Sequence, residues 1–246
     1  MYHYGIIGYP LLHSFSAKYF NEKFEREHID AEYSLYPLKK PVSDKTEKKE
    51  EWPELQQLLD TLDGMNVTFP YKQTIIPYLE CLDETAEVIG AVNVVHKHVG
   101  YNTDCLGFMQ SLKPLLRGYD KQALVLGTGG ASKAVCYGLR KLGIEPVLVS
   151  RTPSKGMLGY TDLNANIMAS HTVIVNCTPL GMLPDVDTCP AIPYELVSER
   201  HLLFDCVYNP KETLFLRKGK AQGASIRNGM EMLTGQAQAA WEIWKR

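Results

Sequence analysis

The chain has 246 residues, enough for one large domain or two modest ones, and its 26 basic and 28 acidic residues leave a net charge of −2. No basic tract points to nucleic acid or an anionic membrane, no apolar run is long enough for a transmembrane span, and the first residues lack the basic leader and cleavage site of a signal peptide. The six cysteines form no CxxC pair and no group with histidines, so we expect reduced thiols in a cytoplasmic protein without a metal site.

The first part of the chain predicts alternating strands and helices. Residues 4–9 form a short apolar strand that ends at Pro10, and residues 17–27 have helical spacing. Between them, Ser14 and Ser16 place two hydroxyls just before a helix start, where both can bind one small anion with help from the helix dipole. Ordinary capping of the helix by a serine is the alternative. The elements that follow are a strand at 31–36, a charged loop or ragged helix at 39–51 and a helix at 54–62.

The next informative stretch is GMNVTFPYK at residues 64–72, which predicts one strand and a turn. Asn66, Thr68 and Lys72 are expected to project from the strand end and its turn toward one site. A lysine at such a place can donate a proton to a developing alkoxide or take one from an alcohol. An exposed loop lysine without a catalytic role is the alternative interpretation.

Two further polar residues follow in the same half of the chain. Residues 83–88 predict a helix, and residues 90–95 (GAVNVV) predict a strand whose one polar residue is Asn93. A lone asparagine among apolar neighbours must find hydrogen-bond partners, either in a substrate or in the backbone. Asp104 either caps the helix that follows or acts as a carboxylate that orients the Lys72 ammonium and hydrogen-bonds a substrate hydroxyl.

Residues 123–152 carry a strand–glycine turn–helix–strand pattern. An apolar strand at 123–126 leads into GTGG at 127–130, helical spacing continues to residue 142, and residues 146–149 form a second strand. The glycines let the turn close tightly and let backbone approach a diphosphate, to which the helix N-terminus offers unpaired N–H groups. A glycine turn that only packs the helix on the strand is the alternative.

The end of the second strand indicates which dinucleotide binds. An NAD site usually has an acidic residue there, which accepts hydrogen bonds from the ribose 2′-hydroxyl. Here the strand ends in Ser150, Arg151 and Thr152, and Lys155 follows without any acid. A guanidinium can hold the 2′-phosphate of NADP in a bidentate, charge-assisted way. The sequence therefore predicts NADP, with a merely solvated Arg151 as the alternative.

The last third of the chain predicts two more buried strands and a terminal helix. The strands lie at residues 171–179 and 202–208, and the loops after them should line the nicotinamide half of the cofactor site. The terminal helix runs to Trp244, and its apolar stripe is assigned to the core, with Gln236 as the exception.

Together, these stretches resemble the shikimate dehydrogenase family. The NVTxPxK and GAVN signatures at their mutual spacing are far more specific than the glycine turn. The matching stretches follow the family order along nearly the whole chain: HSFS at 13–16, NVTFPYK at 66–72, GAVN at 90–93, NTD at 102–104, GTGGA at 127–131, SRT at 150–152, NCTPLGM at 176–182 and GMEMLTGQ at 229–236.

The resemblance implies a role for each matching residue. Ser14 and Ser16 would hold the substrate carboxylate, and Lys72 would be the catalytic acid and base, paired with Asp104 as the second catalytic residue. The side chains that would bind the ring hydroxyls are Thr68, Asn93, Asp104 and Gln236, with Tyr208 nearby. The residues that would bind NADP are Gly127, Thr128, Gly129, Gly130, Ala131, Ser150, Arg151, Thr152 and Lys155, with Cys206 and Gly229 beside the nicotinamide and Glu84 from the amino-terminal lobe.

The resemblance also implies the fold and the reaction. We expect a Rossmann-type, doubly wound NADP-binding domain at residues 103–225 and an α/β substrate-binding domain with a mainly parallel sheet at residues 1–102, with residues 226–246 packed back on it and the active site in the cleft. The expected reaction is the reversible, NADP-dependent reduction of 3-dehydroshikimate to shikimate, in chorismate and aromatic amino acid biosynthesis. The expected protein is a cytoplasmic monomer or homodimer that binds no nucleic acid and no membrane.

The sequence departs from the family pattern at two positions, and it leaves two alternative functions open. Ala17 stands where the family often has proline, and Ser150 stands where asparagine usually precedes the arginine. One rival is a quinate/shikimate dehydrogenase, or a paralogue acting on another hydroxylated cyclic acid. The other is a non-catalytic NADP-binding sensor, against which the presence of Lys72 and Asp104 speaks.

Overall fold

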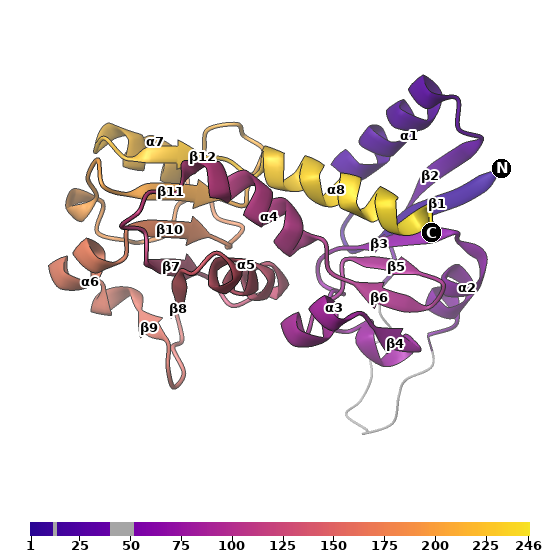
Figure 1. The fold of residues 1–246 in the computed structure, drawn as a ribbon, viewed down its shortest axis with the longest axis horizontal. Helices are drawn as coiled ribbons and strands as arrows, with labels where there is room; N and C mark the ends of the chain where they lie inside the picture. The colour runs from indigo at the N-terminus through magenta and orange to yellow at the C-terminus, as the bar shows by residue number, and fades with distance from the viewer. Residues whose placement is uncertain (12–13, 40–51) are drawn as a thin grey trace. The chain divides into compact units, whose positions relative to one another are not determined.

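The computed structural model describes residues 1–11, 14–39 and 52–246 (Figure 1). His13 of the HSFS stretch and nearly all of the charged segment at residues 39–51 lie outside the described residues. The chain divides into two units, one made of Met1–Thr103 with Ala237–Arg246 and one made of Asp104–Gln236. Among the described residues, no helix is long and apolar enough to cross a membrane.

The first unit is built on a mixed six-stranded sheet with the order β2-β1-β3-β5-β6-β4. β1 pairs in parallel with β2 and β3, β4 pairs in parallel with β6, and β5 is antiparallel to β3 and β6. Its elements are β1 (Tyr2–Ile7), α1 (Phe15–Glu27), β2 (Ala31–Tyr36), α2 (Pro53–Thr61), β3 (Gly64–Val67), a 3₁₀ turn (Ile76–Tyr78), β4 (Cys81–Leu82), α3 (Glu84–Ile89), β5 (Val94–His96) and β6 (Val99–Tyr101).

Alternating side chains divide the core of the first unit between the two faces of this sheet. On one face, Phe20 and Phe24 of α1 pack with Trp241 and Trp244 from the end of the terminal helix. On the other face, apolar residues of α2 and α3 pack against β3 and β5. Gly64 is required where β3 passes beneath Trp244, because a Cβ there would collide with the indole ring. This close approach seats the carboxyl end of the chain in the first unit.

The second unit is a parallel six-stranded sheet with the order β12-β11-β10-β7-β8-β9, which is visible in Figure 1. Its elements are α4 (Asp104–Leu112), β7 (Gln122–Leu126), α5 (Gly130–Lys141), β8 (Glu145–Ser150), β9 (Leu158–Gly159), α6 (Ala165–Ser170), β10 (Val173–Asn176), β11 (Leu202–Asp205), α7 (Leu214–Ala221), β12 (Ser225–Arg227) and the start of α8 (Met230–Trp244), with 3₁₀ turns at Lys113–Leu115, Tyr160–Asp162 and Tyr194–Leu196.

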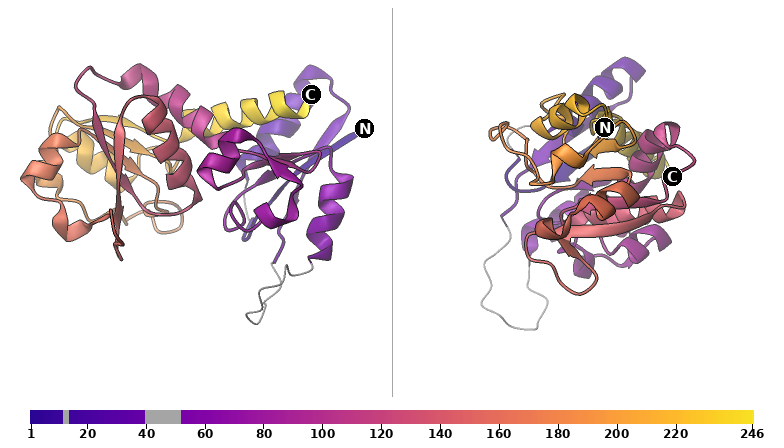
Figure 2. Two further views of the ribbon diagram at one scale, coloured as in Figure 1. Left: turned by 60° about the horizontal axis from the view of Figure 1, so that its bottom comes forward. Right: turned by 90° about the vertical axis from the view of Figure 1, so that its left-hand side faces the viewer.

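Helices cover both faces of the second sheet (Figure 2). Phe108 of α4 and Leu139 of α5 belong to the cluster on one face, while Met168 of α6 and Phe215 of α7 belong to the cluster on the other. From β7 the chain winds outward through β8 and β9, then returns to β10 on the other side of β7. Such a reversal of strand order opens a crevice at the carboxyl ends of the two central strands, where doubly wound sheets bind ligands.

The expected strand at residues 90–95 is wrong in its extent. Only its last two residues belong to β5 (Val94–His96), because Gly90 ends α3 with a positive φ of 66°. The intervening backbone is held by isolated bonds: Val92 N–H donates to the Lys72 carbonyl at 2.7 Å, and Asn93 N–H donates to the Tyr101 carbonyl at 3.0 Å. These bonds are too few to form a ladder.

The sequence predicts that residues 226–246 pack on the substrate-binding domain, but residues 226–236 belong to the second unit. β12 extends the second sheet by pairing with β11, and Met232 of α8 lies in the same core cluster as Phe108 of α4. Gly107 allows α4 and α8 to touch, because a Cβ at this position would collide with the Met232 carbonyl oxygen. Only residues 237–246 of the terminal segment join the first unit.

Candidate functional site

The carboxyl edge of the first sheet brings together stretches that are far apart in the sequence. Ile7 and Val67 are paired at the ends of the parallel strands β1 and β3. Thr68 N–H donates to the Ile7 carbonyl at 2.9 Å, and Tyr9 N–H donates to the Phe69 carbonyl at 3.0 Å. The loop that leads to Ser14 and Ser16 therefore starts at the same edge as the turn that carries Thr68 and Lys72.

The two serines lie at the amino-terminal end of α1. Ser14 occupies the N-cap position, with φ −116° and ψ 121°, but its side chain makes no capping hydrogen bond. Ser16 lies one residue inside the helix and is 6% exposed. Burial raises the pKa of the Tyr33 phenol well above its usual value, while a hydrogen bond with Ser16 acts in the opposite direction. Capping therefore does not explain why hydroxyls occupy these two positions.

Behind the serines lies a buried hydrogen-bond network. The Tyr33 hydroxyl donates to Asn66 Oδ1 at 2.6 Å, and Asn66 Nδ2 donates to the Asn93 carbonyl at 3.2 Å. Asn93 Oδ1 accepts from Thr103 N–H at 2.7 Å, and Asn93 Nδ2 donates to Thr103 Oγ1 at 3.0 Å. Of the two kinds of partner expected for the Asn93 side chain, a substrate or the backbone, the structure shows a backbone partner, Thr103 N–H. The sequence does not single out Tyr33, because a strand tyrosine gives no polar signal, and it assigns Thr103 no partner.

Lys72 is half-buried in the turn that follows β3, and its carbonyl holds the GAVN segment through Val92. Asp104 is the first residue of α4 and is only 6% exposed. The segment between them is fastened further because Asn102 Nδ2 donates to the Ala91 carbonyl at 2.8 Å. The backbone around both expected catalytic residues is therefore well fixed, whereas the pairing of Lys72 with Asp104 stays a prediction.

The glycine turn of the second unit has the shape of a diphosphate cradle. Gly127 has a φ of +105°, and a Cβ there would lie 3.1 Å from the Thr178 methyl group. Gly129 is the N-cap of α5, and a Cβ on it would meet no atom within 4 Å, so the space above the turn is open. Ser132 Oγ donates to the Gly129 carbonyl at 2.6 Å and steadies the first turn of α5. The exposed amino end of this helix can bind phosphate oxygens.

The residues expected to select NADP follow β8 beside that turn. Gly127 N–H donates to the Val149 carbonyl at 2.9 Å, which ties the two strand ends together. Ser150 Oγ accepts from Thr152 N–H at 3.2 Å and shapes the turn after the strand. The Arg151 and Lys155 side chains are exposed, so both cations can reach a bound phosphate group. The structure thus places an open glycine turn and two exposed cations at the ends of neighbouring strands.

A buried network that the sequence did not reveal joins the ends of β10 and β11. Asp205 is fully buried, and its Oδ1 accepts from Asn176 Nδ2 at 2.9 Å and from Val207 N–H at 3.0 Å. Asp205 Oδ2 accepts from Thr213 Oγ1 at 2.5 Å. Burial raises the pKa of Asp205 to about 6, although its three hydrogen bonds oppose that rise. The network positions the two loops that carry Thr178 and Tyr208.

We expect the Asp205 carboxyl to make folding stability fall as the pH rises. Its folded pKa of about 6 exceeds the unfolded value of about 3.9, so its contribution is complete below about pH 4 and is lost as the pH rises through about 6. The shift corresponds to a loss of about 3 kcal/mol. Urea unfolding on both sides of this window should show the slope in the wild type and a flatter profile in Asp205→Asn. An equal slope in both proteins would contradict this account.

The remaining expected residues lie around the start of α8 and in α3. Burial raises the pKa of the half-buried Tyr208 phenol. A Cβ at Gly229 would collide with the Cys206 carbonyl oxygen, so the start of α8 rests directly on the end of β11. Gln236 is 7% exposed, and Glu84 is an exposed residue at the start of α3, in the first unit.

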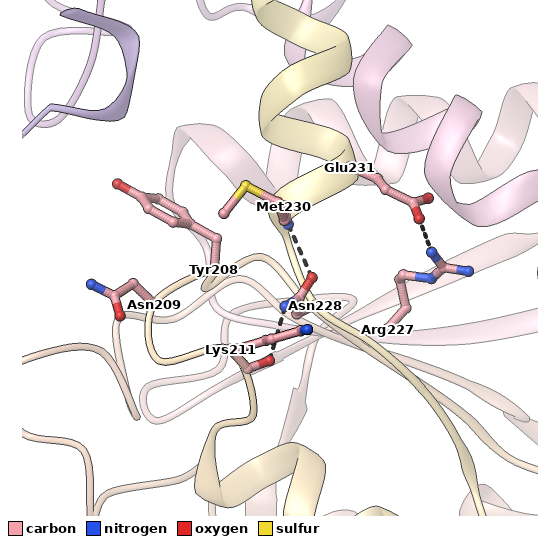
Figure 3. Close-up of a pocket in the computed structure, with 7 residues that line it drawn as sticks. All are labelled: Tyr208, Asn209, Lys211, Arg227, Asn228, Met230 and Glu231. Carbon is pink, nitrogen blue, oxygen red and sulfur yellow. Dashed lines mark hydrogen bonds and ion pairs between the residues drawn. The ribbon is translucent and has the colours of Figure 1, made fainter. Parts of the chain in front are cut away.

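A cavity of about 740 Å³ opens beside Tyr208 within the second unit (Figure 3). Arg227 is paired with Glu231 on its wall, and Asn228 Nδ2 donates to the Lys211 carbonyl at 2.9 Å. The cavity is lined by Tyr208, Asn209, Lys211, Arg227, Asn228, Met230 and Glu231. Within residues 1–11, 14–39 and 52–246, no group of three or more histidine, cysteine or acidic side chains is arranged to hold a metal ion.

Comparison with known proteins identifies relatives that span both units. A family profile described as the shikimate dehydrogenase substrate binding domain matches residues 6–95. The NADP⁺-dependent shikimate dehydrogenase of Desulforamulus reducens is 32% identical over 269 residues, covering 98% of this chain and 88% of the relative. The crystal structure of shikimate dehydrogenase from Aquifex aeolicus superposes with a TM-score of 0.84 at 32% identity, covering 99% of this chain and 92% of that chain. The Thermus thermophilus enzyme in complex with NADP(H) and shikimate gives a TM-score of 0.84 at 30% identity, with coverage of 99% and 93%.

Proposed function

The chain belongs to the shikimate dehydrogenase family, and we infer from this membership that it catalyses the reversible, NADP-dependent reduction of 3-dehydroshikimate to shikimate. This reaction serves the biosynthesis of chorismate and aromatic amino acids. The observation that carries the conclusion is the extent of the similarity. It covers 98% of the chain, so it includes the unit with the NVTFPYK turn as well as the unit with the glycine turn.

We propose that the first unit, with the profile-matched residues 6–95, binds the substrate. The Ser14 and Ser16 hydroxyls would donate to the substrate carboxylate at the amino-terminal end of α1, where the helix dipole favours an anion. Residues that would meet the ring hydroxyls are Thr68, Asn93, Asp104, Tyr208 and Gln236. Recognition of the carboxylate would select this acid over neutral cyclic alcohols.

We propose that Lys72 manages the proton of the reaction. In the reducing direction its ammonium donates a proton to the carbonyl oxygen as negative charge develops there, and in the reverse direction the neutral amine takes the proton from the alcohol. Asp104, fixed at the start of α4, would orient the ammonium and hydrogen-bond a substrate hydroxyl. The bond from Val92 N–H to the Lys72 carbonyl keeps the lysine backbone in place.

We propose that the second unit holds the cofactor, whose nicotinamide supplies or accepts the hydride when it is bound. The open space above Gly129 and the positive φ of Gly127 fit a diphosphate that approaches the backbone closely. The residues that would hold the diphosphate of the cofactor are Gly127, Thr128, Gly129, Gly130 and Ala131. Those that would hold the 2′-phosphate are Ser150, Arg151, Thr152 and Lys155. Cys206 and Gly229 would lie near the nicotinamide, and Glu84 would contribute from the first unit.

We also propose that the protein works in the cytoplasm as a monomer or homodimer and binds no nucleic acid. Its six cysteines are all free thiols, which fits a reducing compartment. Its charges nearly cancel, at −2 overall, and this gives no electrostatic basis for nucleic-acid binding.

The direct test of this function is the reduction of NADP⁺ with shikimate, followed by the absorbance of NADPH. We expect turnover with this pair. We expect little with NAD⁺, because Arg151 favours the 2′-phosphate of NADP⁺, and little with quinate, because the inferred substrate is shikimate. Turnover with quinate as well would favour a quinate/shikimate dehydrogenase. A folded protein that binds NADPH but turns over none of the four pairs would favour the sensor.

A further inference from the structure

We propose that Cys177 and Cys206 form a reversible disulfide at the carboxyl ends of β10 and β11, and that this thiol pair is an oxidation site of the enzyme. The two sulfur atoms lie 3.7 Å apart. The proposal goes beyond the dehydrogenase activity, because the oxidation is a separate reaction that needs neither substrate nor cofactor.

The register of the sheet brings the two cysteines face to face. Asn176 and Asp205 are paired at the ends of the parallel strands β10 and β11, and Cys177 and Cys206 are the next residue on each strand. Cys206 N–H donates to the Asn176 carbonyl at 2.9 Å, so the pairing continues to this point. Neighbouring strands are about 4.8 Å apart, which falls within the Cα separation of roughly 4.4–6.8 Å that a disulfide spans.

Both sulfur atoms are on the same side of the sheet. Each cysteine is partly buried and packs against the same apolar cluster as Phe108 and Phe204. Closing the gap between the sulfur atoms therefore needs side-chain rotation rather than separation of the strands. The four remaining cysteines are Cys81, Cys105, Cys136 and Cys189, and Cys177–Cys206 is the thiol contact that the described structure shows.

The order of the two oxidation steps follows from the surroundings of Cys177. Its hydrogen bond with Cys206 and its burial both raise the pKa of the Cys177 thiol well above the usual value, which makes Cys177 the poorer nucleophile of the pair. Cys206 is therefore expected to react first: its sulfur attacks the O–O bond of hydrogen peroxide and its thiol proton passes to the departing hydroxide, giving a sulfenic acid and water. The Cys177 sulfur then displaces a second water from that sulfenic acid as its thiol proton leaves. In total, two thiols and one peroxide give one disulfide and two waters.

The disulfide would change the loops that meet the cofactor. The Cys206 carbonyl lies against Gly229 at the start of α8. Cys177 is followed by Thr178, whose methyl group lies close to Gly127 of the glycine turn. Closing the gap by side-chain rotation would tie the two strand ends together covalently beside the glycine turn, so the loops that follow them could no longer adjust to the cofactor independently. We expect oxidation to abolish most of the turnover and a dithiol reductant to restore it.

Peptide mapping of the whole protein after treatment with hydrogen peroxide tests the proposal. Trypsin places Cys206 in the peptide of residues 201–211, and Cys177 in the peptide of residues 156–200 together with Cys189. The expected product is a cross-link between these two peptides that is two hydrogen atoms lighter than their sum and disappears after reduction. It should form in the wild type and in Cys189→Ser, and be absent from Cys177→Ser and Cys206→Ser.

Three results would overturn the proposal: no cross-link in the wild type, a cross-link that disappears in Cys189→Ser, or a cross-link that a dithiol reductant does not reverse. A parallel oxidation with saturating NADP⁺ separates this proposal from the assigned function. Slower cross-linking with NADP⁺ would support both the thiol pair and the proposed position of Cys206 beside the nicotinamide. An unchanged rate of cross-linking would support the thiol pair but contradict this position of Cys206.

Discussion

Replacing Lys72 with methionine is expected to lower kcat by roughly 10²- to 10⁴-fold, the usual contribution of a positioned general acid or base. Methionine has a similar length but can neither give nor take a proton, so the proton transfer that accompanies hydride transfer would lose its partner in either direction. Because Lys72 holds the GAVN segment through its backbone carbonyl, the substitution leaves that contact intact. Steady-state turnover of shikimate and NADP⁺ measures the loss, and titration with NADPH shows whether the cofactor still binds.

Two matched variants sharpen the Lys72 experiment. Lys72→Arg keeps a cation at the site but cannot release its proton at neutral pH, so it should be nearly as slow as Lys72→Met. Lys18→Met removes an exposed ammonium from α1 in the same unit and should turn over like the wild type. If Lys72 and Asp104 act as a pair, the kcat losses of Lys72→Met and Asp104→Asn should not add in the double variant. An unchanged kcat in Lys72→Met would remove Lys72 from the mechanism.

Replacing Arg151 with alanine should raise the KM for NADP⁺ by roughly 10- to 100-fold and leave the KM for NAD⁺ nearly unchanged. A hydrogen bond to a charged group contributes about 1.5–3 kcal/mol, and each 1.4 kcal/mol is about tenfold in affinity. Arg151 is exposed after β8, so its removal leaves no cavity and should not change folding stability. Initial rates over a range of each cofactor, with shikimate saturating, give both constants.

Arg140→Ala is the matched control for Arg151. Arg140 is exposed at the end of α5, the opposite end of that helix from the glycine turn, and its Nε lies 3.5 Å from Glu145 Oε1. Its removal should therefore change neither the KM for NADP⁺ nor the KM for NAD⁺. A KM for NADP⁺ that stays the same in Arg151→Ala would mean that Lys155 or Thr152 holds the 2′-phosphate instead. An equal rise for both cofactors would mean that Arg151 shapes the turn rather than selecting NADP.

The sequence alone was enough for the fold class, the family and the reaction, because these depend on local patterns. The glycine turn between a strand and a helix is readable from residues that are neighbours in the chain, and it became the β7–α5 turn of a parallel sheet. The ordered signatures around Lys72 and Asn93 pointed to shikimate dehydrogenases, and the full-length relatives confirmed the family. The predicted strand at residues 31–36 matches β2 residue for residue.

The tertiary structure decided which side chains meet, because those contacts join residues that the chain separates widely. Tyr33 reaches Asn66 across 33 positions, and Asn176 reaches Asp205 across 29, so no local pattern marks either pair as partners. The raised pKa of Asp205 likewise depends on burial by elements that come from elsewhere in the chain.

The cysteines show the same division between sequence and tertiary structure. Their spacing excluded a CxxC motif, and nothing in the spacing singles out Cys177 and Cys206 from the other four. Strand register places their sulfur atoms 3.7 Å apart. Local propensity and periodicity determine which segments become strands and helices, whereas the pairing of distant strands determines which polar groups share a buried site.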